Sequence, residues 1–149
     1  MKHLAIGMIL LLPLYAAHPA GFAHVTGSQL KTMEKGMAGK KLASNPLGNY
    51  GNHTMQLSHR EASGEAELHE TMNDIFVVES GEATLVVGGT VASAKTTAPN
   101  EVRGPSIQGG EKKKLGAGDI VHIPAKTPHQ LLVDSGKQFT YAVIKVAAQ

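Results

Sequence analysis

The sequence of 149 residues contains no cysteine, no tryptophan, three tyrosines and three phenylalanines. Without cysteine the chain cannot form disulfides, so its stability must come from a packed core and from dimerisation. So few aromatic side chains offer no platform on which nucleic-acid bases would stack. The formal net charge is only +2, and the lysines are scattered apart from Lys112–Lys114. We therefore expect no nucleic-acid partner.

Long apolar runs are also missing, because the run near the N-terminus, Leu4–Tyr15, is shorter than a membrane span. Lys2 and His3 precede this run, and small residues in Gly21–Ala23 offer a cleavage site. This order is typical of a secretory signal peptide. We predict that residues 1–23 are a signal peptide, that the mature chain is secreted or periplasmic, and that it has no membrane contact after cleavage. The alternative is an uncleaved anchor.

The composition, with 42% apolar and 17% charged residues, is that of a globular protein. Seventeen glycines and seven prolines indicate many turns. From Asn52 onward the side chains alternate with the period of two that is typical of a β-strand. Short strands without a sustained helical period between them predict an all-β, antiparallel barrel or sandwich. Beyond the first, we expect strands at 74–79, 83–87, 119–123, 129–134 and 139–146.

Before the strands, residues 24–46 are predicted to form an N-terminal helix and a linker, and residues 47–149 a single barrel. Ser28 is the expected N-cap of the helix, whose apolar face has helical spacing and consists of Leu30, Met33 and Met37. The polar segment Thr90–Lys114 is expected to be either a hairpin with an extended tip or a loop that partly covers one mouth of the barrel.

Two stretches of the barrel region combine histidines with glycine and proline at a defined spacing. In the second stretch, Pro124 lies six residues after Gly118, and His129 lies five residues after Pro124. This order resembles the second motif of the cupin superfamily, in which the histidine binds a metal. Lys126 stands where the family pattern has a glycine. That departure affects the geometry of the loop more than the metal ligand.

The first stretch resembles the first cupin motif, which has His-x-His, then an acidic residue, then a glycine seven residues later. Aligned through Gly81, Asp74 takes the acidic position, His69 the second histidine position and Glu67 the first. In the alternative alignment His69 is the first histidine and Thr71 stands in the second position. We prefer the former because it keeps the spacing from Asp74 to Gly81.

Residues 67 and 69 are two apart, so on a strand their side chains point to the same side, into the barrel. Imidazoles combined with carboxylates suit a divalent transition metal. We therefore predict one metal ion per chain, copper, iron or manganese with zinc as an alternative, held by His69, His129, Asp74 and Glu67. Glu67 either completes the ligand set or acts as a catalytic general base. The alternative is a metal-free barrel in which these groups hydrogen-bond one another.

Three further residues are candidates for the site. His53 and His59 share one face of the first predicted strand, and either could add a third imidazole. The alternative for both is a hydrogen-bonded histidine in the core or at the rim. Arg60 is the candidate for binding an acidic or sugar substrate at the mouth of the barrel.

The resemblance covers roughly residues 47–146 and implies a double-stranded β-helix, or jelly-roll, barrel with a short N-terminal helix, and a homodimer. Since cupins catalyse many reactions, the resemblance alone does not choose one. Outside the cytosol the available substrates include polysaccharides and small molecules. We therefore predict a metal-dependent oxidoreductase, with carbohydrate as the first substrate class to test. In size and export the chain is similar to copper-dependent cupins that cleave cellulose oxidatively. The alternatives are a non-catalytic cupin that binds a small ligand or metal, and a zinc or manganese lyase or isomerase.

Overall fold

The computed structural model describes residues 19–149, so positions 1–18 of the predicted signal peptide lie outside the described residues. The prediction of an all-β fold with one short helix is confirmed. Within residues 19–149 no helix has the length and apolar character needed to cross a membrane. The elements are α1 (Gly27–Met37), β1 (Leu42–Asn49), β2 (His53–Arg60), β3 (Ala66–His69), β4 (Met72–Val87), β5 (Thr90–Val91), β6 (Lys95–Ala98), β7 (Glu101–Gly104), β8 (Ile107–Gln108), β9 (Glu111–Gly116), β10 (Ile120–Ile123), β11 (His129–Leu132) and β12 (Phe139–Ala147).

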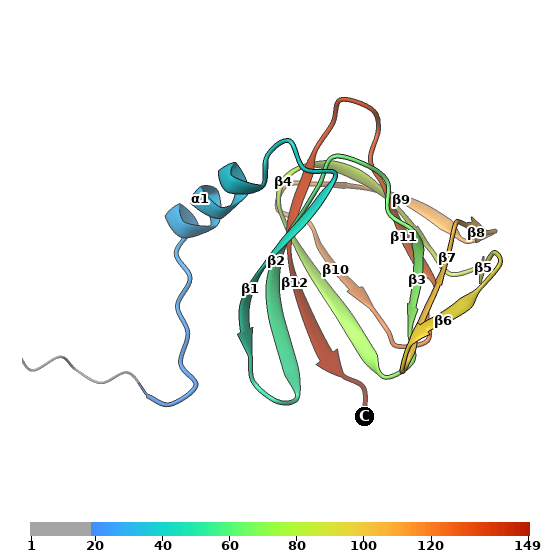
Figure 1. The fold of residues 1–149 in the computed structure, drawn as a ribbon, viewed down its shortest axis with the longest axis horizontal. Coiled ribbons are helices and arrows are strands. Elements are labelled where there is room, and N and C mark those ends of the chain that lie inside the picture. Colours follow the sequence, from blue (N-terminus) through green and yellow to red (C-terminus); the bar gives the residue numbers. More distant parts are fainter. Residues whose placement is uncertain (1–18) are drawn as a thin grey trace, which may run out of the picture.

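The long strand β4 joins the two walls of the barrel. Its first half pairs with β10 and β12, and its second half pairs with β9 and β11. The first wall continues from β12 to β2 and β1, and the second continues from β11 to β3, β7 and β6. Figure 1 shows the two walls facing each other across the interior, with α1 outside the first wall. Strands β5 and β8 form a separate ladder of two strands.

Strand β4 passes from one wall to the other at Gly81, where the backbone has φ +76°. A Cβ atom at this position would overlap the carbonyl oxygen of Gln138. The ladder between β4 and β12 shifts register directly beside this point, between Thr140 and Tyr141. Both the left-handed conformation and the close backbone approach require glycine here. This is the glycine through which the first motif was aligned.

The apolar core lies between the two walls and draws on both. Along β12, Phe139, Tyr141 and Val143 point inward, and the same alternation brings Lys145 into the interior after them. The core therefore ends at a polar region that the same strands continue to line. The buried cluster consists of Phe76, Val78, Ala83, Leu85, Leu115, Ile123, Leu131, Val133, Phe139, Tyr141 and Val143.

Helix α1 packs on the outside of β1 and β2 through the predicted apolar face, of which Met37 is fully buried. The predicted N-cap, Ser28, is wrong. Thr26 caps the helix, because its hydroxyl accepts from the backbone of Gln29 while the Gln29 side chain accepts from the backbone of Thr26. This reciprocal capping box satisfies two backbone donors that Ser28, already inside the first turn, cannot reach.

The boundary between linker and barrel also differs from the prediction, since β1 begins at Leu42, inside the segment expected to be a linker. Pro46, at the end of the expected linker, lies on an edge strand, where the missing backbone donor of proline costs no ladder hydrogen bond. The ladder with β2 shifts register between Pro46 and Gly48, which accommodates the turn-like residues within a strand.

The segment Thr90–Lys114 was expected to be a hairpin or a loop. It contains the short strands β5, β6, β7 and β8 and the first part of β9. The hairpin of β6 and β7 extends the second wall, with β7 paired to β3. This pairing brings Glu101 opposite His69 and Arg103 opposite Glu67. The segment therefore supplies part of the barrel wall behind the polar region.

We expect Gly81→Ala to lower the free energy of unfolding by about 2 kcal/mol or more, because an L side chain at this φ is strained and its Cβ meets backbone. Gly116→Ala is the matched control, since Gly116 also lies on a strand paired to β4 but has no atom within 4 Å of an added Cβ. Urea unfolding of both variants measures the difference. Equal losses in the two variants would contradict this account of Gly81.

Candidate metal centre

Two strand pairings bring the ligand candidates together. Glu67 and His69 lie on β3, and His129, at the start of β11, pairs directly opposite Glu67. The ligand atoms of Glu67, His69 and His129 all lie within 4.8 Å of one another. Both histidines are buried, with relative exposures of 3% and 4%. The second wall thus forms one side of a compact cluster with two nitrogen donors and one carboxylate.

The first wall adds Asp74 from β4, whose side chain is also buried. Its Oδ2 atom lies 3.3 Å from Nε2 of His69 and 3.5 Å from Nε2 of His129. One carboxylate oxygen therefore faces both imidazoles at the same time. The structure brings the four predicted ligands, His69, His129, Asp74 and Glu67, into one cluster.

Both imidazoles are held by their other ring nitrogen. Nδ1 of His69 lies 2.7 Å from Oε2 of Glu101, and Nδ1 of His129 lies 3.0 Å from the carbonyl oxygen of Thr127. Each acceptor favours the tautomer with the proton on Nδ1, in which Nε2 presents a lone pair to the cluster. Two such lone pairs with carboxylate oxygens beside them fit a divalent transition metal.

A lysine contacts two members of this cluster. Nζ of Lys145 lies 2.7 Å from Nε2 of His69 and 2.8 Å and 3.1 Å from the two oxygens of Asp74. An ammonium group can only donate, so the contact with His69 uses the same Nε2 lone pair that a metal would use. Lys145 comes from β12, directly across the ladder from Asp74.

Burial would raise the pKa of the Asp74 carboxyl, but the neighbouring rings of His129 and His69 and the charge of Lys145 outweigh burial. They hold this pKa far below its ordinary value. Burial and the Lys145 charge would lower the pKa of His69. Its close contact with Asp74 and the charges of Asp74 and Glu101 prevail and raise that pKa. Asp74 is therefore the permanent anion of the cluster.

Glu67 is held by two arginines through the same oxygen. Its Oε1 atom lies 2.8 Å from Arg103 and 3.5 Å from Arg60, while Oε2 lies 3.5 Å from Nε2 of His69. Nε of Arg60 donates to the hydroxyl of Tyr141 at 3.1 Å. Burial raises the pKa of Tyr141, so this hydroxyl stays neutral and can accept the bond. The arginines thus orient Glu67 with Oε2 toward the histidines.

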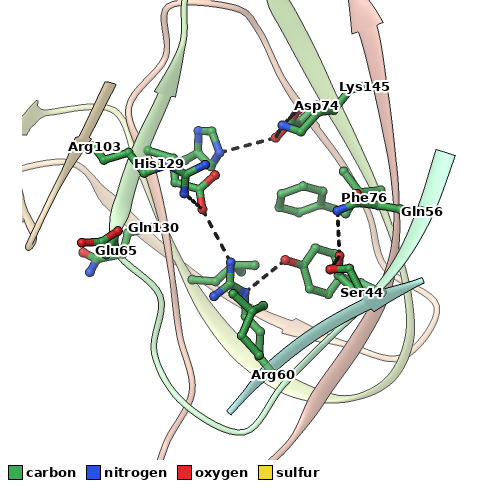
Figure 2. Close-up of a pocket in the computed structure, with 16 residues that line it drawn as sticks. Ser44, Gln56, Arg60, Glu65, Asp74, Phe76, Arg103, His129, Gln130 and Lys145 are labelled. Carbon is green, nitrogen blue, oxygen red and sulfur yellow. Dashed lines mark hydrogen bonds and ion pairs between the residues drawn. The ribbon is translucent and has the colours of Figure 1, made fainter. Parts of the chain in front are cut away.

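The cluster opens on a cavity of about 180 Å³ between the two walls. Figure 2 shows Asp74 and Lys145 on one side of this cavity and Arg103 with His129 on the other, with Arg60 at its lower end. The lining mixes charged residues with apolar ones. It consists of Leu42, Ser44, Gln56, Ser58, Arg60, Glu65, Glu67, Asp74, Phe76, Arg103, His129, Gln130, Leu131, Tyr141, Val143 and Lys145.

Comparison with known proteins gives matches by structure alone. No family model matches the sequence, and no curated protein matches it. A cupin protein from Bacteroides fragilis superposes with a TM-score of 0.51 at 19% identity, over 71% of this chain and 77% of that one. The chain has the cupin fold.

Other solved structures share this fold. The polyketide cyclase RemF from Streptomyces resistomycificus has a TM-score of 0.51 and 16% identity, over 72% of this chain but slightly less than two thirds, 66%, of RemF. A putative mannose-6-phosphate isomerase from Ralstonia eutropha has a TM-score of 0.53 and 15% identity, over 74% of this chain and 89% of that one. At these low identities the superpositions show a common fold and leave the reaction open.

Within the cupin barrel the cluster follows the preferred alignment of the first motif. Glu67 and not Thr71 joins His69, because Thr71 is exposed beyond the end of β3. Arg60, the predicted substrate-binding residue, lies at the cavity. Its side chain is only 10% exposed, so it belongs to the interior and not to the outer surface.

The structure places His53 and His59 outside the cavity, which corrects the expectation that either adds an imidazole. The cavity is lined by the other face of β2, with Gln56, Ser58 and Arg60. His53 stacks on Tyr50 at the end of its strand, with ring centroids 4.8 Å apart. His59 is buried on the side of α1, between the hydroxyl of Thr140 at 2.8 Å and the carboxylate of Glu61 at 3.1 Å.

Sequence reasoning missed Lys145, Glu101 and Arg103. The signal for Lys145 was present, because it shares the alternation of Phe139, Tyr141 and Val143 along a predicted strand. Glu101 and Arg103 fall in the segment that was expected to be either a hairpin or a loop, without strand bounds, so their orientation could not be assigned. Their place in the site depends on the pairing of β7 with β3.

We expect Glu101→Gln to weaken metal binding about 10- to 100-fold, because the anion that fixes and polarises the His69 ring is removed. Glu79→Gln, at an exposed position of β4, is the control. Titration of metal-stripped protein with Zn²⁺ gives both affinities. Unchanged affinity in Glu101→Gln would show that Glu101 does not support the site.

The depressed pKa of Asp74 predicts a specific loss of stability in acid. Because the folded-state pKa lies below the unfolded-state value of about 3.9, the carboxylate stabilises the fold above that pH. This contribution is lost as the pH falls toward the folded-state pKa. The free energy of unfolding of Asp74→Asn should therefore fall less steeply than that of the wild type between about pH 5 and about pH 2, a range that brackets the unfolded-state pKa.

Denaturant unfolding across this pH range measures the effect, and Asp134→Asn is the control because Asp134 lies at an exposed turn. The expected order is a steep fall for the wild type and for Asp134→Asn, and a shallow one for Asp74→Asn. Three parallel curves of unfolding free energy against pH would contradict the role of Asp74 as the buried anion.

Proposed function

We propose that the chain is an exported, metal-dependent cupin enzyme that oxidises a small anionic substrate. The observation that supports it most directly is the convergence of Glu67, His69 and His129 within 4.8 Å beside a cavity. Both histidines present Nε2 to this point because other groups hold Nδ1. Arginines line the same cavity, so a substrate anion would bind next to the metal.

In this proposal His69, His129 and Glu67 hold the metal, and Asp74 lies beside them as a further oxygen donor. A bound copper, iron or manganese ion would supply the redox chemistry that activates dioxygen or peroxide. Asp74 stays ionised throughout and stabilises positive charge on the neighbouring groups. The mixed set of nitrogen and oxygen donors suits any of these three metals and also zinc.

Glu67 serves as a ligand in this arrangement in preference to a general base. Arg103 and Arg60 both engage Oε1, so Oε2 is the oxygen that faces His69. The two guanidinium groups keep the carboxylate in one orientation and compensate its charge.

The cavity favours a small carboxylate as the substrate. Its volume of about 180 Å³ is below the roughly 300–1,000 Å³ of pockets for drug-sized ligands. The planar guanidinium groups of Arg60 and Arg103 match the geometry of a carboxylate. The apolar side chains of Phe76, Leu131 and Val143 line the same space and would contact a short carbon skeleton. A polysaccharide would have to react at the mouth, so we rank it second.

Two other functions use the same residues. A cyclase and a putative isomerase are among the proteins that share this fold. With redox-inert zinc, the site would favour a lyase or isomerase that stabilises an enolate. A cupin that binds a small acid without turnover is the non-catalytic alternative. The identity of the metal and the consumption of oxygen separate these functions.

The proposal also includes export and formation of a homodimer, and both rest on the sequence. Signal cleavage would place the new N-terminus at or near His24, and N-terminal sequencing of protein from the exported fraction tests this. Light scattering during size-exclusion chromatography tests for the homodimer. Retention of residues 1–23 would favour the uncleaved anchor, and a monomer would contradict the pairing.

The first experiment measures metal content by mass spectrometry in protein purified from the exported fraction. We expect near-stoichiometric copper, iron or manganese in the wild type. His69→Ala and His129→Ala should each reduce metal occupancy about tenfold or more, since each removes a buried ligand. His122→Ala is the control, because His122 is exposed on β10. Equal metal content in all four proteins would contradict the proposed site.

The second experiment measures oxygen consumption by the loaded protein with a panel of small carboxylates and, in parallel, with polysaccharides. We expect consumption with a carboxylate, and a rise in KM in Arg103→Gln because a cation for the substrate is lost. Zinc as the resident metal, without oxygen consumption, would favour the lyase or isomerase. Turnover of polysaccharide alone would overturn the small-anion substrate.

A further inference from the structure

We infer that Lys145 is a resident cation of the metal site, and that its ammonium group and an incoming metal ion compete for the same donors. The inference rests on the proposed function, because it concerns the regulation of that metal site. It makes metal binding conditional on the movement of one side chain. Its basis is the position of Lys145 among the ligands, its place between His69 and the cavity, and the balance of charges.

The ammonium group contacts donors that a metal would need. It lies 2.7 Å from Nε2 of His69 and within 3.1 Å of both oxygens of Asp74. Nε2 is the lone-pair nitrogen of His69, since Nδ1 is held by Glu101. A lone pair that accepts from an ammonium group cannot bind a metal at the same time. Metal binding to His69 therefore requires Lys145 to leave.

The position of Lys145 also covers His69 from the cavity. Lys145 lines the cavity and His69 does not, although His129 and Asp74 do. His69 is 3% exposed, while the Lys145 side chain is 27% exposed. A metal ion that enters from the cavity meets the ammonium group before it can reach Nε2. The lysine has a flexible stem on which to withdraw, whereas both ring nitrogens of His69 are engaged.

The ion-paired network of the site is balanced in charge with Lys145 in place. In this network the carboxylates of Glu67, Asp74 and Glu101 oppose the cations of Arg60, Arg103 and Lys145, which gives three charges of each sign. A divalent ion that enters with Lys145 in place adds two positive charges to this neutral network. Removal of the lysine charge leaves one excess negative charge at the site, which attracts a divalent cation. The lysine thus lowers metal affinity by repulsion as well as by occupancy.

The experiment titrates metal-stripped, full-chain protein with Zn²⁺, a redox-inert probe, in competition with a chromophoric chelator. We expect Lys145→Met and Lys145→Gln to bind Zn²⁺ about 100-fold more tightly than the wild type, because repulsion and occupancy are both removed. Lys145→Arg keeps the positive charge and should bind more weakly than either neutral variant. Lys112→Met, at an exposed position on β9, should bind like the wild type.

A second readout is the thermal stability of the metal-free proteins. Lys145→Met should melt at a lower temperature than the wild type, because buried Asp74 loses its ammonium partner. Zn²⁺ should raise the melting temperature of Lys145→Met more than that of the wild type. A lysine that serves packing alone would lower the melting temperature without any change in Zn²⁺ affinity, and that result would overturn the inference.

The outcomes separate this inference from the proposed function. If His69→Ala abolishes Zn²⁺ binding but Lys145→Met and Lys145→Gln remain within about twofold of the wild type, the metal site stands and the inference fails. If neither the wild type nor the Lys145 variants bind Zn²⁺, both fail. If Lys145→Met does not fold without metal, Lys145→Gln, which retains a hydrogen-bond donor, decides by the same criterion.

Discussion

The buried carboxylate of Asp74 is the interaction around which the polar half of this barrel is organised. A charge removed from water destabilises a protein unless partners compensate it closely. Here three strands other than its own supply those partners, with His69 from β3, His129 from β11 and Lys145 from β12. Because the Asp74 charge must be compensated, residues from both walls of the barrel meet at this one point.

A second layer of charges supports the first. Glu101 holds His69 from behind, while Arg103 and Arg60 hold Glu67. Among the described residues, no buried side-chain nitrogen or oxygen lacks a hydrogen-bond partner. A polar network in which every group is satisfied defines one arrangement of its members. The geometry needed for ligand binding thus exists before any ligand arrives, and the lysine is the member of the cluster that can give way.

The apolar core and the polar site are two ends of the same alternation. On β12 the inward row passes from Phe139 through Tyr141 to Lys145, and on β4 it passes from Val78 through Phe76 to Asp74. The tight crossing at Gly81 sets the parity of both halves of β4. Packing at one end thereby positions charge at the other.

Much of this arrangement could be predicted from local patterns. Period-two alternation and turn residues indicate the strands, and the spacings around His69, Asp74 and His129 indicate the ligands, because such signals lie within a few consecutive residues. The error at His53 and His59 has a different origin. Alternation shows which residues share a face, but not which face points inward, and on β2 the face with polar Gln56 and Ser58 lines the cavity.

Local patterns along the chain are sufficient for the class of fold, most of the strands that flank the site and the identity of its ligand candidates. The charges that surround these candidates follow only from the folded arrangement. Glu101, Arg103 and Lys145 reach His69, Glu67 and Asp74 across strand pairings between residues distant in sequence. Electrostatic compensation depends on distance in space, and no local pattern in the chain encodes the strand pairing that brings these charges within a few ångströms.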